Sequence, residues 1–362
     1  MRLSPSRILL LAFAAASLLL LPSCHAPKTA SEKEVLVDML LKEYNLNDGP
    51  GACAVVARNG SVLYEKGFGL ASLEEHRRVD STTNFRLASL TKQFTAMAVL
   101  ILVNDAKLSL KDPLTKFFPD FPSYGSAITV RHLLTHTSGI IDYESLLPDS
   151  QTVQIHDRDV LRLLSGIDSV YFGPGAQYRY SNSGYALLAL IVEKVSGQSF
   201  ALFLKNHIFD PLGMKNTVAF EDGISTVPNR AFGYSRSDTG WTLTDQSATS
   251  AVLGDGGIYS SIHDLLKWDH SLTVGYLVPL YLLRESWTPV ALSDGSKAGY
   301  GFGWALSISG RYPRQYHTGS TRGFRNVIVR YPVQHLTIIV LTNRNEGDLS
   351  SLAEEIAGVY LD

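Results

Sequence analysis

The chain has 362 residues, of which 45% are hydrophobic and 18% are charged, and its formal net charge is −2. This composition is typical of a globular protein with ample material for a core, and it excludes a disordered chain. The low net charge, with no basic stripe, gives no electrostatic surface for DNA or RNA, so nucleic acid is not an expected partner.

The N-terminus has the pattern of an export signal. Arg2 and Arg7 precede an apolar run over residues 8–21, which is short for a membrane span but suits a secretory signal. The Leu-Pro-Ser-Cys that follows resembles a lipobox, in which Cys24 would be lipidated and become the first residue. The alternative is an ordinary cleaved signal with an incidental cysteine. We expect an exported lipoprotein, anchored in a membrane and facing the periplasm or the cell exterior.

Hydrophobic spacing predicts the elements in chain order. Helical spacing occurs in four stretches, which are residues 31–44, those from Thr91 onward, 186–197 and 350–360. Strand-like runs occur at 52–58, 61–67, 300–309, 314–320, 324–332 and 336–344, and Asn59-Gly60 between the first two is a strong hairpin signal. We predict an α/β (α+β) fold, with an antiparallel sheet built from both chain ends, flanked by helices.

These patterns also suggest how the chain is divided. We expect a signal with a lipobox over residues 1–24, a polar tether over 25–34 and a single domain over 35–362. Within that domain, a mostly helical region over about 89–250 is inserted between the strands of the two chain ends.

A short motif stands at the start of the helix predicted from Thr91. The helix is apolar on nearly every side, so it should be buried, yet it opens with Ser89-Leu90-Thr91-Lys92. Residues i and i+3 share a helix face, so Lys92 can hydrogen-bond the Ser89 hydroxyl. A serine needs a neighbouring base to become a nucleophile, and a lysine is such a base only where its surroundings lower its pKa. A serine near a helix start with a lysine reaching solvent is the alternative.

Two further motifs follow in the same order as in a known family. They are Tyr180-Ser181-Asn182, and His317-Thr318-Gly319-Ser320 on a predicted strand. Together with Ser-x-x-Lys they resemble the serine β-lactamase and penicillin-binding-protein superfamily, in its AmpC-type branch. Taken singly, Tyr180 could be a structural phenol and Asn182 a helix N-cap. The resemblance runs from about Val35 to the C-terminal helix and implies a β-lactamase/transpeptidase-like fold with no cofactor.

The resemblance also implies roles for individual residues. Ser89 would be the nucleophile, Lys92 and Tyr180 the proton-transfer pair, and Asn182 a donor to the acyl side of the substrate. The backbone N–H groups of Ser89 and Ser320 would form the oxyanion hole. An acyl transfer needs these parts on any fold, namely a nucleophile, a base, an acid and two oxyanion donors.

The third motif supplies the expected substrate strand. Thr318 and Gly319 would line it, together with His317, which stands where β-lactamases have lysine. This departure shifts the expectation from β-lactam hydrolysis toward peptidases and esterases. An unperturbed histidine titrates near pH 6.5, so we expect His317 to be mostly uncharged at neutral pH and to change its charge between about pH 6 and 8.

The resulting functional expectation is an exported serine hydrolase that forms an acyl-enzyme on Ser89. Its substrates would be peptides, amides or esters, as for a D,D-peptidase, a D-aminopeptidase or an esterase, with weak β-lactamase activity conceivable. The alternative is a catalytically poor member of the same fold that binds cell-wall peptides or senses β-lactams.

Other residue patterns give weaker evidence for a functional site. His132 and His136 have the i,i+4 spacing of a metal pair, but no glutamate follows His132 and no third ligand is near, so no metal site is predicted. Cys53 lies in a strand-like run and is expected to be a core residue rather than a catalytic thiol. The absence of Gly-x-Ser-x-Gly excludes an α/β-hydrolase nucleophile elbow. The glycine-rich residues 254–257 are expected to form a tight turn bordering the cleft.

Overall fold

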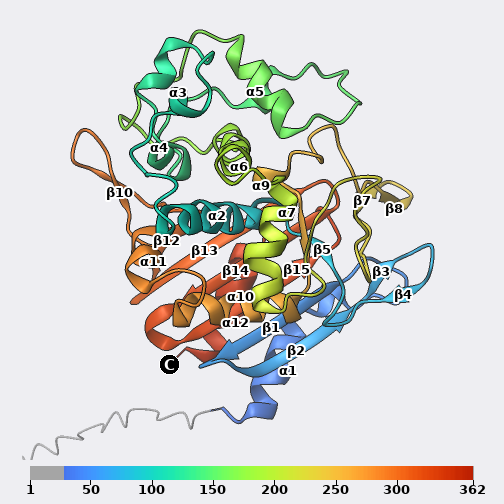
Figure 1. The fold of residues 1–362 in the computed structure, drawn as a ribbon. Coiled ribbons are helices and arrows are strands. Elements are labelled where there is room, and N and C mark those ends of the chain that lie inside the picture. Colours follow the sequence, from blue (N-terminus) through green and yellow to red (C-terminus); the bar gives the residue numbers. More distant parts are fainter. Residues whose placement is uncertain (1–27, 362) are drawn as a thin grey trace, which may run out of the picture.

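The computed structural model describes residues 28–361 (Figure 1). The expected signal and Cys24 lie outside the described residues. The strands are β1 (Ala52–Arg58), β2 (Ser61–Phe68), β3 (Leu70–Ser72), β4 (Arg77–Arg78), β5 (Phe85–Arg86), β6 (Val218–Ala219), β7 (Tyr234–Ser237), β8 (Gly240–Leu243), β9 (Ile258–Ser260), β10 (Val290–Ala291), β11 (Lys297–Ala298), β12 (Ala305–Ser309), β13 (Tyr312–Thr321), β14 (Phe324–Tyr331) and β15 (Leu336–Thr342).

The helices connect and cover these strands. They are α1 (Ala30–Leu40), α2 (Lys92–Asn104), α3 (Leu114–Phe117), α4 (Val130–Leu134), α5 (Asp157–Ser165), α6 (Asn182–Ser196), α7 (Phe200–Leu204), α8 (Asp210–Leu212), α9 (Leu253–Gly256), α10 (Ile262–Val274), α11 (Leu280–Ser286) and α12 (Leu349–Tyr360). Two 3₁₀ turns matter for the site, η2 (Ala88–Thr91) and η4 (Tyr143–Leu146).

The main sheet unites the two ends of the chain. Its strand order is β12-β13-β14-β15-β1-β2, and every neighbouring pair is antiparallel. The N-terminal strand β1 pairs along its whole length with the C-terminal strand β15, from Ala52 opposite Thr342 to Arg58 opposite Leu336. The predicted antiparallel sheet from both chain ends is confirmed.

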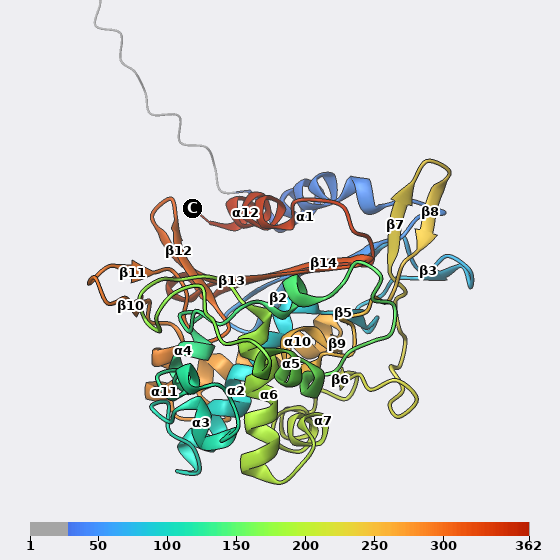
Figure 2. The ribbon, with the colours of Figure 1, turned by 90° about the horizontal axis from the view of Figure 1, so that it is seen from above.

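Both faces of this sheet are covered, as Figure 2 shows with α1 and α12 on one side and the other helices opposite them. Side chains alternate between the faces along each strand. In β15, Ile338 and Val340 pack into the smaller core beneath α1 and α12, whereas Ile339 and Leu341 belong to the larger core. The sheet is therefore a buried platform, and the helical region is built on the face opposite α1 and α12.

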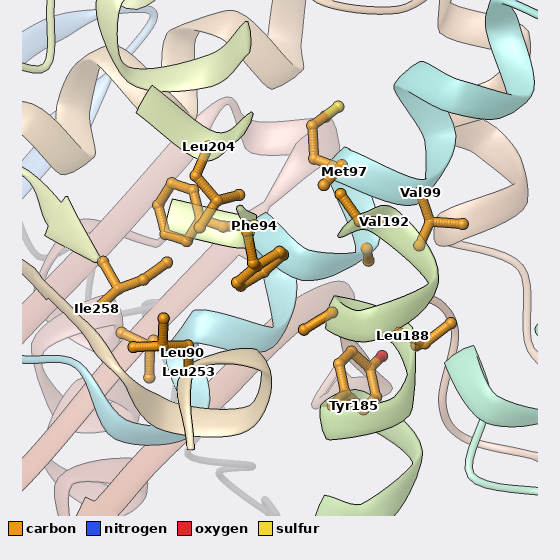
Figure 3. Close-up of a cluster of buried hydrophobic side chains, with 14 of the residues drawn as sticks. Leu90, Phe94, Met97, Val99, Tyr185, Leu188, Val192, Leu204, Leu253 and Ile258 are labelled. Atoms are coloured by element: carbon orange, nitrogen blue, oxygen red, sulfur yellow. The ribbon is translucent and has the colours of Figure 1, made fainter. Parts of the chain in front are cut away.

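The larger core centres on α2 and α6. Leu90, Phe94, Met97 and Val99 from η2 and α2 face residues of α6 such as Leu188, with side chains from α7, α9 and β9 around them (Figure 3). Eleven consecutive residues of α2, from Lys92 to Leu102, are buried. The helix that is apolar all round is thus a core helix, as its composition predicts.

Element boundaries differ from the predictions in three places. The run over residues 300–309 is a strand only from Ala305, because Gly303 turns the chain with a φ of +74° against the backbone of α2. The helix expected over 31–44 ends at Leu40 and continues as a 3₁₀ turn. Its start at Ala30 lies within the stretch expected to be a tether.

Between residues 28 and 361, no single helix is long and apolar enough to cross a membrane. One pair of helices, Asn182–Ser196 and Phe200–Leu212, is together long and apolar enough for a membrane span, by length and composition only, and the pair is bent by 76°.

Candidate active site

Ser89 lies on a tight turn between β5 and α2. The preceding residue, Ala88, has a φ of +50°, a left-handed conformation that costs a non-glycine residue on the order of 1 kcal/mol. Strand β9 holds this turn in place, since the N–H of Leu87 donates to the carbonyl of Ile258 at 2.8 Å. The turn presents the half-buried Ser89 at the N-terminal end of a buried helix.

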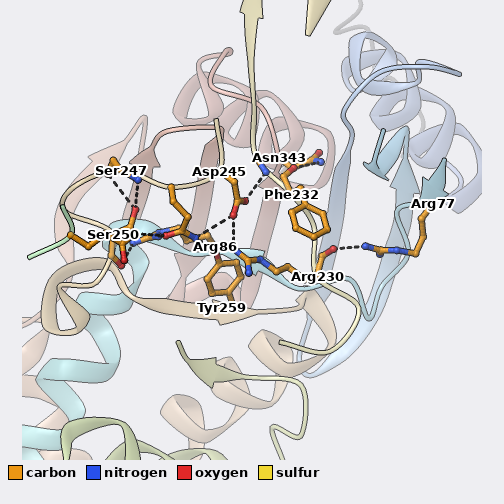
Figure 4. Close-up of polar contacts among 12 residues, drawn as sticks. Arg77, Arg86, Arg230, Phe232, Asp245, Ser247, Ser250, Tyr259 and Asn343 are labelled. Atoms are coloured by element: carbon orange, nitrogen blue, oxygen red, sulfur yellow. Dashed lines mark hydrogen bonds and ion pairs between the residues drawn. The ribbon is translucent and has the colours of Figure 1, made fainter. Parts of the chain in front are cut away.

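Arg86 anchors the same segment from the strand side. Its guanidinium donates to the carbonyl of Ser250 at 2.7 Å and to Gln246 Oε1 at 3.0 Å, across 164 and 160 residues of sequence (Figure 4). The guanidinium is buried, and a buried charge that keeps such partners fixes the geometry of the elements it connects. The turn that carries Ser89 is therefore tied to the loop that precedes α9.

Lys92 is fully buried, and its ammonium nitrogen contacts three acceptors. Nζ lies 3.1 Å from Ser89 Oγ, 2.8 Å from Asn182 Oδ1 and 2.9 Å from the carbonyl oxygen of Asp255. It also lies 5.0 Å and 5.5 Å from the ring centroids of Tyr180 and Tyr185, within the range of cation–π attraction. The burial of a lysine in an apolar helix is explained by this set of partners.

Asn182 connects Lys92 to the opposite wall of the site. Its Oδ1 accepts from Lys92, and its Nδ2 donates to Glu144 Oε1 at 3.0 Å. The backbone N–H of Asn182 donates to Asp142 Oδ2 at 2.6 Å, and Ser181 is the N-cap residue of α6. The structure thus places the Asn182 side chain in the site, and it does not act as the helix N-cap.

Tyr180 lies beside Lys92 with 36% of its surface exposed. Its ring packs on His136, with centroids 4.3 Å apart, and His136 is in turn 4.6 Å from the ring of Tyr300. Within residues 28–361 the Tyr180 hydroxyl makes no hydrogen bond, so the structure brings its ring, and not its hydroxyl, into contact with the Ser89–Lys92 pair. The hydroxyl is free to bond a substrate group.

His317 is buried, 5% exposed, and its ring nitrogens are both engaged. Nδ1 lies 2.6 Å from the carbonyl of Thr318, and Nε2 lies 2.9 Å from the hydroxyl of Tyr300. Burial, with a smaller contribution from the charge of Lys92, lowers the pKa of His317 to about 3. The ring is therefore uncharged at neutral pH, as expected, but the expected change of charge between about pH 6 and 8 is wrong, because that value assumed a solvated ring.

The end of β13 presents an open strand edge. Strand β12 pairs with residues Tyr312–Tyr316 only, so within residues 28–361 the edge from His317 to Thr321 has no strand partner on that side. Thr321 and Phe324 form the hydrogen-bonded pair that closes a two-residue turn. Counting back from that pair, residues of β13 alternately hydrogen-bond to β14 and face away from it. The backbone N–H and C=O groups of Thr318 and Ser320 therefore point to the open edge, as a substrate strand and an oxyanion donor require.

Gly319 allows β13 to pack directly on the turn that carries Ser89. A Cβ atom at this position would lie 2.1 Å from the carbonyl oxygen of Leu87. No side chain can occupy that space, so the glycine sets the distance between the strand edge and Ser89. The motif residues Ser89, Lys92, Asn182, His317 and Gly319 are thus brought together from three separate parts of the chain.

Three acidic residues around Lys92 and Asn182 were missed by the sequence analysis. They are Asp142, Glu144 and Asp255. Burial raises the pKa of Asp255 to about 7, although Lys92 opposes the shift, and its Oδ2 accepts from the Tyr143 hydroxyl at 2.8 Å. The glycine-rich turn that holds Asp255 was expected at the cleft, but no spacing rule connects Asp142 or Glu144 with Asn182.

The residues of the weaker patterns, His132, His136 and Cys53, have structural roles. His132 Nδ1 accepts from the N–H of Thr129, and His136 Nδ1 accepts from the N–H of Ser181, so the two histidines serve different backbone groups. Among residues 28–361 no cluster of three potential metal ligands occurs. Cys53 is a fully buried core residue, and burial raises the pKa of its thiol, as expected for an unreactive cysteine.

A second polar region adjoins the open edge of β13. A pocket of roughly 370 Å³ is lined by Arg322, directly after that edge, and by polar side chains that include Gln246, Ser247 and Thr249. Arg325, in contrast, donates to the carbonyl groups of Thr321 and Phe324. Of Arg322 and Arg325, Arg322 lines this pocket, whereas the Arg325 guanidinium is held by backbone carbonyl groups.

Comparison with known proteins places this geometry in context. The family model described as Beta-lactamase matches residues 40–360. Penicillin-binding protein 4* of Bacillus subtilis is 34% identical over 308 residues, which cover 81% of this chain and 68% of that protein. D-aminopeptidase of Gluconobacter oxydans is 30% identical over 317 residues, 85% of this chain and 58% of that protein. The octameric penicillin-binding protein homologue from Pyrococcus abyssi superposes with a TM-score of 0.78 at 27% identity, covering 92% of this chain and 78% of that one.

Proposed function

The chain belongs to the beta-lactamase family of serine hydrolases, and we propose that it forms an acyl-enzyme on Ser89 with peptide, amide or ester substrates. The resemblance inferred from the three motifs is thereby confirmed at the level of the family. The observation that carries the proposal is the contact of the buried Lys92 with Ser89 Oγ, supported from two sides by Asn182 Oδ1 and the carbonyl of Asp255.

That arrangement supports proton transfer from the serine. The transfer requires the neutral form of Lys92, which has two N–H bonds and one lone pair. In that form Asn182 Oδ1 and the Asp255 carbonyl would accept the two N–H bonds, and the lone pair would face the Ser89 hydroxyl, which can pass its proton to Nζ as Oγ attacks the substrate carbonyl. The bond from Oγ to the carbonyl carbon forms as the carbonyl π electrons move onto the oxygen, and the bond to the leaving group breaks when this oxyanion collapses and the leaving group is protonated.

The proton then passes to the leaving group. Tyr180 is the proposed partner in this transfer, because its ring lies against Lys92 and its hydroxyl makes no hydrogen bond to any residue between 28 and 361. The N–H groups of Ser89 and Ser320 would stabilise the oxyanion in both acylation and the later attack of water. Thr318 and Gly319 would hold the substrate along the open edge of β13.

Export completes the proposal. Arg2, Arg7, the apolar run over residues 8–21 and Cys24 support an exported protein with a lipid anchor in a membrane, facing the periplasm or the cell exterior. Peptides and amides met in that compartment are the substrate class that fits both the site and the relatives.

The test is covalent labelling with a fluorophosphonate and with a fluorescent penicillin, followed by turnover of p-nitrophenyl esters and amino-acid amides. We expect the label on Ser89, and we expect Ser89→Ala to lose label and turnover, by about 10⁴-fold or more, with an almost unchanged Tm. Ser126→Ala is the control, because Ser126 is exposed and lies outside the three motifs. Label on another residue would contradict the proposal, and labelling without turnover would identify a binding or sensing protein instead.

A further inference from the structure

Tyr180 lies in the site without a hydrogen bond that would fix its hydroxyl. Because 36% of its surface is exposed and the hydroxyl has no partner among residues 28–361, the position of that oxygen depends on how the ring is packed. Among the described residues the ring of His136 is the nearest, with centroids 4.3 Å apart, whereas those of His317 and Tyr300 are 6.2 Å and 6.4 Å away. His136 is therefore the main support of the Tyr180 ring.

His136 also holds the backbone on both sides of Tyr180. Its carbonyl oxygen accepts from the N–H of Arg179 at 2.9 Å, and its Nδ1 accepts from the N–H of Ser181 at 3.2 Å. One buried residue thus binds the residue before Tyr180, the residue after it and the ring between them. The backbone and the side chain of Tyr180 are placed by the same neighbour.

Three properties are combined at position 136. The residue has a φ of +57°, a left-handed conformation in which histidine, asparagine and aspartate are several-fold enriched among non-glycine residues. It also supplies an acceptor atom for a backbone N–H and an aromatic ring for Tyr180. Asparagine offers the conformation and the acceptor without the ring, and phenylalanine offers the ring alone. Histidine meets all three requirements.

The stability of the core does not by itself explain a histidine here. Burial, with a smaller contribution from the charge of Lys92, lowers the pKa of His136 well below its usual value, so the ring is neutral with its proton on Nε2. Nε2 is buried and has no hydrogen-bond partner within residues 28–361. It lies among the rings of Tyr180, Tyr185 and Tyr300, whose centroids are 4.3, 5.1 and 4.6 Å from that of His136. A buried donor without an acceptor costs on the order of 1–3 kcal/mol, and aromatic faces offset only part of that cost.

We infer that His136 is the positioning residue for Tyr180, and that it places the hydroxyl that protonates the leaving group. His136 is only 1% exposed, so it does not touch the substrate, and it acts through Tyr180 alone. A misplacement of about 1 Å in a catalytic group can cost about 100-fold in rate, so a packing contact of this kind has a kinetic effect. This inference rests on the proposed acyl transfer at Ser89.

A double-mutant cycle tests the inference. Asparagine tolerates the left-handed backbone and its Oδ1 can accept from Ser181, so His136→Asn removes the ring and little else. We expect kcat for a p-nitrophenyl ester, divided by the number of Ser89 sites that a fluorophosphonate labels, to fall about 10- to 100-fold. KM should change less than about 3-fold, because the hydroxyl acts in the transition state. In Tyr180→Phe, which has no hydroxyl to place, His136→Asn should lower kcat by a further factor of less than about 2.

The matched control is His132→Asn. His132 lies four residues earlier, and its Nδ1 likewise accepts a backbone N–H, that of Thr129. Among residues 28–361 its ring makes no contact with the ring of Tyr180, so this variant should keep the native kcat. Native kcat in His136→Asn, an equal loss in His132→Asn, or equal losses from His136→Asn in the native and Tyr180→Phe backgrounds would overturn the inference. Because unfolded protein is not labelled, a loss of stability does not imitate the expected result.

Crystal structures of the native protein, His136→Asn and His132→Asn separate this inference from the proposed function. The Tyr180 hydroxyl should lie about 1 Å or more from its native position in His136→Asn, or occupy two positions, and it should stay in place in His132→Asn. A hydroxyl displaced in this way supports the positioning role even if the native protein turns over nothing. A hydroxyl that has not moved in His136→Asn contradicts the role even if Ser89 is acylated.

Discussion

Lowering the pH from 7.5 to 5 should remove about 2 kcal/mol of stabilisation that depends on His317, whereas buried Asp255, whose pKa is raised to about 7, acts in the opposite direction. The His317 ring is buried with the proton on Nδ1, because Thr318 offers a carbonyl to that nitrogen and the Tyr300 hydroxyl donates to Nε2. Protonation would remove the acceptor at Nε2 and place a second cation near Lys92. The pKa of His317 is accordingly lowered to about 3.

The sign of the effect follows from proton linkage. The unfolded chain has a histidine pKa of about 6.5, so between pH 6.5 and 3 the unfolded state binds more protons than the folded state. Stability is therefore fully present above about pH 6.5 and is lost as the pH falls through that window. At 1.36 kcal/mol per pH unit, the loss due to His317 is about 2 kcal/mol at pH 5.

The assay is urea unfolding of the native protein and His317→Gln at pH 7.5, 6.5, 5.5 and 5. Glutamine is neutral at each pH and can still accept a hydrogen bond from Tyr300, so on going from pH 7.5 to 5 the free energy of unfolding of the native protein should fall by about 2 kcal/mol relative to that of the variant. His263→Gln, at an exposed position, is the control and should behave like the native protein. Equal changes in the native protein and His317→Gln, or an NMR resonance of His317 that titrates near pH 6.5, would refute the reasoning.

Three further predictions concern the site and the N-terminus. Lys92→Ala and Tyr180→Phe should each lower kcat about 100-fold or more, and the double variant little further, because the two share one proton path; additive losses would contradict this pairing. Gly319→Ala should lower the free energy of unfolding by about 1–3 kcal/mol and reduce kcat/KM, since its Cβ would lie 2.1 Å from the Leu87 carbonyl oxygen; native-like values in urea unfolding and kinetics would mean that the turn yields freely. Cys24→Ser should abolish metabolic labelling with a fatty acid, and a lipoprotein signal-peptidase inhibitor should leave the uncleaved precursor; normal processing in both cases would indicate an ordinary signal.

Patterns of neighbouring residues sufficed for the architecture. The Asn59-Gly60 turn and the apolar runs around it predict β1 and β2, because a hairpin is specified by residues adjacent in sequence. The all-round apolar composition of α2 predicts its burial for the same reason. The three short motifs, in the order in which the family has them, were enough to indicate the family. They also predict the Ser89–Lys92 pair, because residues three apart on a helix lie on the same face whatever the rest of the fold.

Only the tertiary structure decided which groups surround that pair. Lys92 meets Asn182 across 90 residues and Asp255 across 163, and no local pattern encodes contacts over such separations. Charge states depend on these non-local surroundings, so a histidine expected to titrate near neutrality proved to be buried beside Tyr300 with a pKa of about 3. The contact between Glu144 and Asn182 was likewise not predictable from the sequence, because no local pattern connects a single glutamate with the asparagine that folding places beside it.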